Sequence, residues 1–164
     1  MKPLRLAIIG AGGRGRSMAD LARRSERSAE IVAAVDPASE KRELAATQFG
    51  IAAELLFSDH QDFLRAGLDI DATIIATDVR SHAEIAGDCL KSGLPIFLEK
   101  PMTRTIEEAL AVAAIARATG TPIMVGFNLR YAPYYRRLHE LISGGAIGQL
   151  ISIEWKEILS PAHW

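Results

Sequence analysis

The sequence contains one cysteine and no long apolar run, and each absence excludes a class of protein. With Cys89 alone, no disulfide can form within the chain, and such usage is typical of a reducing cytoplasm. No segment approaches the roughly 18 consecutive apolar residues that a membrane-spanning helix requires. The apolar residues that open the chain stop at Gly10, which is too soon for a signal peptide. We therefore predict a cytoplasmic protein that does not insert into membranes.

An excess of charge of one sign is also missing. The chain has 19 Lys and Arg against 20 Asp and Glu, a net charge of −1, and the two signs are interspersed. Such a surface offers no basic patch for nucleic acid or for an anionic membrane. Neither Cys89 nor the histidines show the spacing of metal ligands, so we predict no metal site. With 49% hydrophobic residues in 164, the chain can bury one ordinary globular core.

What the sequence does contain is a glycine-rich turn between a strand and a helix. An apolar run leads into Gly10, Gly12 and Gly15, the G-x-G-x-x-G spacing of dinucleotide-binding turns. The first glycine permits a tight turn, the second lets a pyrophosphate approach the backbone, and the third lets helix and strand pack closely. The next apolar strand ends at Asp36, about 25 residues further on, where an acid accepts the ribose hydroxyls of adenosine. We therefore predict a dinucleotide site rather than a plain strand–turn–helix.

Short apolar strands alternate with helical patterns along the chain. Strands are expected at 4–9, 30–36, 54–57, 71–76, 95–98 and 122–126, and helices at 14–26, 39–49, 59–66, 80–92 and 104–118. This alternation predicts βαβ units, and the near-continuous apolar strands indicate a sheet covered by helices on both faces. Ser39 is expected to cap the second helix, and Ser58 or Asp59 the third. The fold class is therefore α/β: a Rossmann domain over residues 1–126, with a doubly wound parallel sheet in the order 3-2-1-4-5-6.

The pattern changes after residue 126. A helical stretch at 134–142 is followed by an alternating apolar and polar run at 149–158, which is typical of a half-buried strand in an antiparallel or mixed sheet. One strand cannot pair its own edges or bury its own face. We therefore interpret residues 127–164 as the truncated start of an α+β domain, with a linking helix and a first strand. We expect that strand to be disordered, paired with another chain or docked on another molecule.

A glutamate and a lysine follow the fifth expected strand. Ligands of open α/β sheets bind beyond the carboxyl ends of the strands, so Glu99 and Lys100 stand where a nicotinamide ring could lie. A lysine at that place can hold a substrate oxygen and relay its proton. On spacing alone, however, a solvated pair at the end of a strand is the better interpretation.

Five sequence blocks together resemble the glucose–fructose oxidoreductase, inositol dehydrogenase and MocA family. They are Gly-Ala-Gly-Gly-Arg-Gly at 10–15, Ala76-Thr77 with His82, Glu99-Lys100-Pro101, Gly-Phe-Asn-Leu-Arg-Tyr-Ala-Pro at 126–133 and Ile-Ser-Gly-Gly-Ala-Ile-Gly at 142–148. The resemblance covers essentially the whole chain. It implies an NAD(P)-dependent oxidoreductase of sugars, polyols or related compounds. The implied fold is a Rossmann domain followed by an α+β domain with a large open sheet.

The motif and the resemblance together give a set of site residues. The predicted cofactor-binding residues are Gly10, Gly12, Gly13, Arg14, Asp36, Ala76, Thr77, His82, Glu99, Lys100 and Asn128. The resemblance implies that Lys100 is the catalytic lysine. NAD is expected rather than NADP, because Asp36 repels a 2′-phosphate and no arginine immediately follows it. The implied partners are a sugar-like or polyol substrate and further copies of the same chain.

Two departures from the family pattern leave alternatives open. Asp78 stands where the family usually has proline, and a later glycine pair with an acid–base histidine is absent from the sequence. A histidine at a helix start, such as His82, is more often a capping or packing residue than a catalyst. The chain alone is therefore expected to bind NAD with little or no dehydrogenase activity. The alternatives are a non-catalytic dinucleotide-binding regulator, against which Glu99 and Lys100 argue, and a partner subunit.

Overall fold

The computed structural model describes residues 2–26 and 28–158. The chain separates into two compact units, Met1–Gly126 and Phe127–Trp164. Among the described residues, no helix combines the length and the apolar character that crossing a membrane requires.

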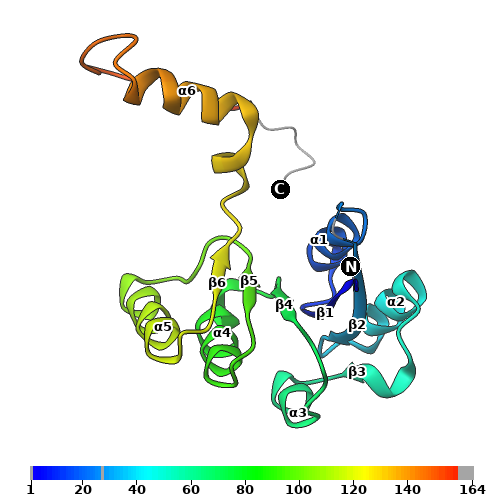
Figure 1. Ribbon diagram of the computed structural model, residues 1–164. Coiled ribbons are helices and arrows are strands. Elements are labelled where there is room, and N and C mark those ends of the chain that lie inside the picture. The colour runs from blue at the N-terminus through cyan, green and yellow to red at the C-terminus, as the bar shows by residue number, and fades with distance from the viewer. Residues whose placement is uncertain (1, 27, 159–164) are drawn as a thin grey trace. The chain divides into compact units, whose positions relative to one another are not determined.

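The first unit is built on a six-stranded sheet in the order β3-β2-β1-β4-β5-β6 (Figure 1). The strands are β1 (Leu4–Ile9), β2 (Ala29–Val35), β3 (Leu56–Phe57), β4 (Ala72–Ile75), β5 (Ile96–Leu98) and β6 (Ile123–Val125). All neighbouring strands are parallel, since each is joined to the next by a crossover that contains a helix. The predicted α/β Rossmann fold and its strand order are confirmed.

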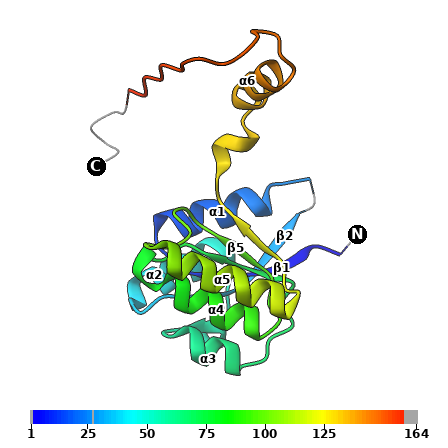
Figure 2. The same ribbon diagram turned by 90° about the vertical axis from the view of Figure 1, so that its left-hand side faces the viewer.

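Helices cover both faces of this sheet. They are α1 (Gly13–Arg23), α2 (Ser39–Phe49), α3 (His60–Arg65), α4 (His82–Lys91) and α5 (Ile106–Thr119), with the short 3-10 helices η1 (Ala53–Leu55) and η2 (Val79–Ser81). Residues of α1 and α2 pack into one core, and residues of α3, α4 and α5 into the other. Figure 2 shows α4 and α5 side by side, and the two helices are in contact.

The central strand β1 serves both cores at once. Its residues point alternately to opposite faces, so that Leu6 and Ile8 pack with α1 and α2, while Ala7 and Ile9 pack with the other three helices. Burial on both faces explains why this strand is continuously apolar from Leu6 to Ile9. Each fully buried side chain of the size of Ile8 contributes about 1.5–3 kcal/mol to stability.

The helix ends follow the expected capping chemistry with one exception. Asp59 caps α3 by accepting a hydrogen bond from the Gln61 N–H at 2.7 Å. The prediction that Ser39 caps α2 was wrong, because Ser39 is already the first helical residue and Ala38 precedes it. The Asp36 carboxylate accepts the Ala38 N–H at 3.0 Å. This aspartate therefore fixes the turn that begins α2.

The second unit contains α6 (Pro133–Ser143), preceded by the 3-10 helix η3 (Asn128–Tyr131). No strand forms at 149–158, where one was predicted; these described residues continue without helix or strand. Trp155 lies against the rings of Tyr134 and Tyr135, with centroids 6.3 and 5.2 Å apart. A strand needs a neighbour for its backbone hydrogen bonds, and within the described part of this unit there is none.

Candidate functional site

The turn between β1 and α1 passes very close to the end of β4. Gly10 has a φ of 92°, and a Cβ atom there would stand 2.6 Å from the carbonyl carbon of Ala76. A Cβ atom on Gly15 would stand 2.0 Å from the carbonyl oxygen of Gly10. Around Gly12 and Gly13, by contrast, added Cβ atoms would meet nothing within 4 Å. The turn thus combines close packing at two glycines with open backbone at the N-terminus of α1, where N–H groups favour anions.

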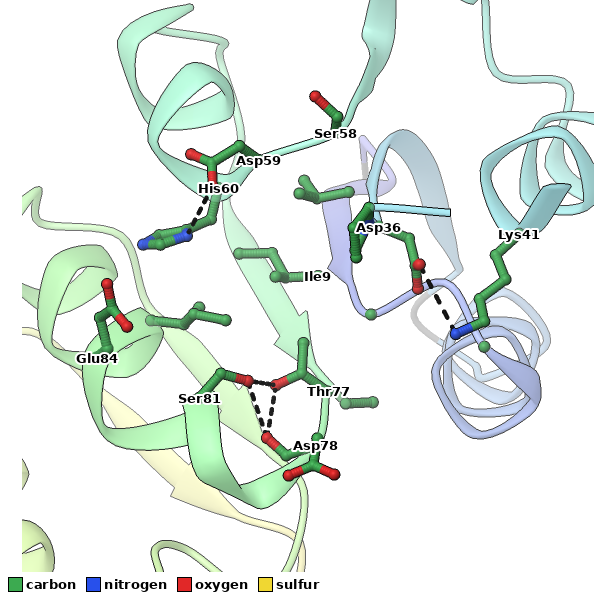
Figure 3. Close-up of a pocket in the computed structure, with 16 residues that line it drawn as sticks. Ile9, Asp36, Lys41, Ser58, Asp59, His60, Thr77, Asp78, Ser81 and Glu84 are labelled. Carbon is green, nitrogen blue, oxygen red and sulfur yellow. Dashed lines mark hydrogen bonds and ion pairs between the residues drawn. The ribbon is translucent and has the colours of Figure 1, made fainter. Parts of the chain in front are cut away.

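A pocket of about 480 Å³ lies beside this turn, at the carboxyl ends of the central strands (Figure 3). This volume is in the range of small-molecule sites. Five of the predicted cofactor residues line it: Gly10, Gly12, Asp36, Ala76 and Thr77. These five residues follow the carboxyl ends of β1, β2 and β4, the edge at which ligands of open α/β sheets bind.

Asp36 is buried at the edge of the pocket and connects the glycine turn to α2. Its Oδ2 accepts the Ala11 N–H at 3.0 Å, and its Oδ1 accepts the Ala38 N–H at 3.0 Å. The Lys41 ammonium lies 3.8 Å from Oδ1, as Figure 3 shows. Arg42 donates to the backbone carbonyl of Asp36 at 2.6 Å. A carboxylate has about four lone-pair sites, so both oxygens keep capacity for a ligand hydroxyl.

The turn after β4 contains Thr77 and the departure from the family pattern, Asp78. Ser81 donates to the Thr77 hydroxyl at 3.0 Å. Asp78 accepts from both the backbone and the side chain of Arg80, at 2.9 and 2.8 Å. The hydrogen bond from the Arg80 guanidinium lowers the pKa of Asp78 to about 2. Asp78 therefore begins η2 as a side-chain cap, in the place of the proline.

His82 is the first residue of α4 and is almost entirely buried, with 1% of its surface exposed. Its Nδ1 lies 2.9 Å from the carbonyl oxygen of Pro101, and its Nε2 lies 3.2 Å from the carbonyl oxygen of Thr77. Both ring nitrogens thus face backbone carbonyls of the turns after β5 and β4. The ring does not belong to the pocket lining, so the structure gives it a place behind the site.

Glu99 and Arg14 form an ion pair between the end of β5 and the first turn of α1. The Arg14 Nη2 and Nε atoms lie 2.9 and 3.0 Å from Oε1 of Glu99. The Glu99 side chain is only 10% exposed, and its Oε2 is buried without a hydrogen-bond partner in the described part of the chain. Lys100 follows with an exposed side chain and a cis peptide bond to Pro101. The remaining predicted residue, Asn128, begins η3 in the second unit.

Sequence reasoning did not assign most of the pocket lining to the site, including the polar residues Lys41, His60, Ser81 and Glu84. Figure 3 shows Asp36 and Lys41 on one side of the pocket and His60 and Glu84 on the other. His60 Nε2 lies 3.1 Å from an oxygen of Asp88 on α4, although the two are far apart in the sequence. These residues could have been predicted from their places in the sequence, because they follow expected strands or lie near the start of expected helices at the same sheet edge.

The family model of the GFO/IDH/MocA oxidoreductases, described as an oxidoreductase family with an NAD-binding Rossmann fold, matches residues 4–127. The chain belongs to the GFO/IDH/MocA family. This confirms the family resemblance found in the five sequence blocks. It also establishes the first unit as the NAD-binding fold of that family.

Relatives in the GFO/IDH/MocA family include inositol dehydrogenases. The chain is 31% identical over 153 residues to the inositol 2-dehydrogenase of Corynebacterium glutamicum (strain R), covering 93% of this chain and 44% of that protein. The scyllo-inositol dehydrogenase of Lactobacillus casei, solved with bound NAD(H) and scyllo-inositol, has a TM-score of 0.80 at 25% identity, covering 90% of this chain and 43% of that one.

A third similar protein differs in its described cofactor. It is an oxidoreductase of Desulfitobacterium hafniense described as NADPH-dependent, with a TM-score of 0.80 at 27% identity, covering 91% of this chain and 42% of that one. The chain therefore spans less than half the length of these GFO/IDH/MocA proteins.

Proposed function

We propose that this chain carries the cofactor-binding part of an NAD-dependent dehydrogenase that oxidises a secondary alcohol of a polyol or sugar. The observation that carries the proposal is the unpartnered Oε2 of Glu99, buried at the end of β5 beside Lys100. The same sheet edge holds the glycine turn and Asp36. The inositol dehydrogenases among the relatives support the substrate class.

The side chains of the first unit fit a dinucleotide along this edge. Asp36 would accept the adenosine ribose hydroxyls, and the open backbone at Gly12 and Gly13 would receive the pyrophosphate. Arg14, about half exposed, adds a positive charge at that place. At the other end, the buried Glu99 oxygen requires a donor, which a ribose hydroxyl or a carboxamide N–H would supply.

The charges around Asp36 favour NAD over NADP. The 2′-phosphate of NADP would approach the buried carboxylate of Asp36, and the two negative charges would repel each other. The guanidinium of Arg42 is already engaged by the backbone carbonyls of Asp36 and Pro37, at 2.6 and 3.0 Å. Lys41 lies 3.8 Å from Asp36 and offsets part of the repulsion. We therefore expect NAD to bind more tightly than NADP, with Lys41 reducing the difference in affinity.

Lys100 is the residue proposed for the proton transfer. When bound, the nicotinamide supplies the acceptor for the hydride that leaves the carbinol carbon. Lys100, exposed directly after β5, would hold the reacting hydroxyl. In its neutral amine form it takes the hydroxyl proton as the carbon–oxygen double bond forms. Glu99 and Arg14 keep their ion pair beside it and fix the start of this segment.

The assembly and location of the protein are part of the same proposal. Burial raises the pKa of the Cys89 thiol to about 12, so this single cysteine stays a reduced core residue, as suits the cytoplasm.

Ile151 and Ile153 are exposed in the second unit and would be covered in a homo-oligomer. Light scattering of the purified protein measures the number of copies.

Cofactor titrations and an activity assay test the proposal. Calorimetric titration of the 164-residue chain should show binding of NAD, with weaker binding of NADP. The polypeptide encoded by the whole reading frame should then reduce NAD with at least one member of a polyol panel that includes myo-inositol and scyllo-inositol. Cofactor binding without turnover on any polyol would favour the dinucleotide-binding regulator instead.

A further inference from the structure

The ring of His82 joins two turns that no other described polar contact connects. Backbone hydrogen bonding between β4 and β5 reaches the Glu99 N–H, which donates to the Ile75 carbonyl at 2.9 Å. Beyond that point, His82 bridges the carbonyl oxygens of Thr77 and Pro101 at 3.2 and 2.9 Å. The turn that lines the pocket and the turn that carries Lys100 are therefore held together through one imidazole.

The chemistry of the two contacts requires a donor at this place. A carbonyl oxygen only accepts hydrogen bonds, so both contacts are hydrogen bonds when both ring nitrogens carry a proton, whereas a neutral His82 ring has a single N–H and donates to one of the two carbonyls. His82 is 1% exposed, whereas Thr77 is half-buried and Pro101 is exposed, so both contacts are part-buried. Removing the ring donor leaves a part-buried carbonyl without its protein partner, which weakens the link between the two turns.

We propose that His82 is a positioning residue, which sets Lys100 relative to the pocket without touching substrate or cofactor. The inference rests on the proposed function, because it takes Lys100 as the proton-transfer group. Pro101, whose carbonyl His82 holds, directly follows Lys100 in the chain. Thr77, whose carbonyl it holds on the other side, lines the pocket. The Nδ1 contact therefore serves catalysis and the Nε2 contact serves cofactor binding.

Two conservative variants separate these contacts. The side-chain amide nitrogen of asparagine can stand near the place of Nδ1, and that of glutamine near the place of Nε2. His82→Asn should keep the Pro101 contact, with kcat within about threefold of the wild type and NAD affinity lowered about three- to tenfold. His82→Gln should keep the Thr77 contact and NAD affinity, while kcat falls on the order of 10–100-fold because Lys100 is misplaced.

A matched control removes a comparable buried hydrogen bond at the other end of α4. Thr121 donates to the Leu90 carbonyl at 3.0 Å in a buried setting. Thr121→Val should lower the stability of the protein but leave kcat and NAD affinity within about twofold of the wild type, since it lies at the opposite edge of the sheet. If Thr121→Val lowers kcat as much as His82→Gln does, the effect is general destabilisation and the proposal is overturned.

A second measurement needs neither cofactor nor substrate. In the 164-residue chain, amide hydrogen exchange at Met102 should speed up in His82→Gln and stay unchanged in His82→Asn, because only the asparagine variant keeps the Pro101 contact. Equal effects of the two variants on exchange, or on kcat, overturn the assignment of the two nitrogens. If the wild-type polypeptide binds NAD but turns over no polyol, the proposed function fails, whereas the exchange pattern still decides whether His82 fixes the Lys100 turn.

Discussion

Arg14 binds one oxygen of Glu99, with 2.9 Å between Nη2 and Oε1, and the other oxygen is buried with no donor among residues 2–26 and 28–158. The pair connects the start of α1, which follows β1, to the end of β5, and β4 lies between β1 and β5 in the sheet. A buried acceptor without a donor costs the folded protein about 1–3 kcal/mol. A ligand that donates a hydrogen bond to Oε2 of Glu99 would recover that free energy. Under the proposed function, the bound dinucleotide would supply that donor.

Replacing Glu99 by glutamine tests this preference. Glu99→Gln keeps the shape, but it removes the charge and can turn an N–H group towards the ligand donor. We expect NAD affinity to fall about 10–100-fold, the range of one hydrogen bond to a charged group, without a loss of thermal stability. Calorimetry measures the affinity. The control is Glu108→Gln on α5, which alters the ion pair with Arg104 and should leave NAD affinity unchanged.

Asp36 should decide the choice of cofactor. The wild-type chain should bind NAD about tenfold or more tightly than NADP, and Asp36→Ala should narrow that ratio by removing the buried charge. The same change removes the acceptor of the Ala11 and Ala38 N–H groups. It should therefore also lower stability by about 1.5–3 kcal/mol. Equal or tighter binding of NADP by the wild type in a titration would contradict the assignment.

Lys100 should be needed for turnover and not for cofactor binding. In the polypeptide encoded by the whole reading frame, Lys100→Ala should lower kcat by a factor on the order of 10²–10⁴, with NAD affinity within a few-fold. Lys91→Ala is the control, since Lys91 is an exposed lysine near Asp88 at the end of α4. Turnover like that of the wild type would make Lys100 a solvated residue at a strand end.

The glycines of the turn should respond in opposite ways to alanine. Gly15→Ala would force a Cβ atom to within 2.0 Å of the Gly10 carbonyl oxygen, so we expect a loss of stability of about 1–3 kcal/mol or more. Gly13→Ala meets nothing within 4 Å and improves helix propensity. It should keep or raise stability while weakening NAD binding, as thermal melts with and without NAD would show.

Cys89 should make the stability of the chain depend on alkaline pH. Burial raises the pKa of its thiol to about 12, whereas in the unfolded chain it ionises near about 8.5. The unfolded state therefore loses a proton first, and the contribution of Cys89 to stability, complete below that pH, decreases as the pH rises towards 12. Denaturant melts at rising pH should show this slope, and Cys89→Ala should reduce it. Fast reaction of the native thiol with a disulfide reagent at pH 8 would refute its burial.

The elements that the sequence predicts well are those with local causes. The strands and the glycine turn follow from periodicity and from a motif a few residues long, and the strand order was inferred from the doubly wound fold class that these indicate. The place of Asp36 at the end of a strand and at the edge of the pocket was predictable. Its hydrogen bond from the Ala38 N–H was not, and neither was the start of α2 at Ser39, which makes Ala38 the cap. The missing strand at 149–158 shows the same limit, because a strand exists only with its neighbours.

The geometry of the site depends on contacts between distant elements, which no local pattern contains. Of the two carbonyl partners of His82, Thr77 lies 5 positions before it and Pro101 lies 19 positions after it in the chain. The pairing of Arg14 with Glu99 spans 85 positions. A single sequence indicates which residues stand at the sheet edge, and only the packing of the sheet brings their atoms within bonding distance.

The outer strands of the sheet have a consequence for how the molecule meets other copies of itself. β3 contains two residues and β6 contains three. An edge strand offers unpaired backbone groups to any passing chain, and very short edges limit that templating. The short edges therefore oppose growth of the sheet of the first unit into aggregates, and the proposed homo-oligomer would form through the side chains of the second unit.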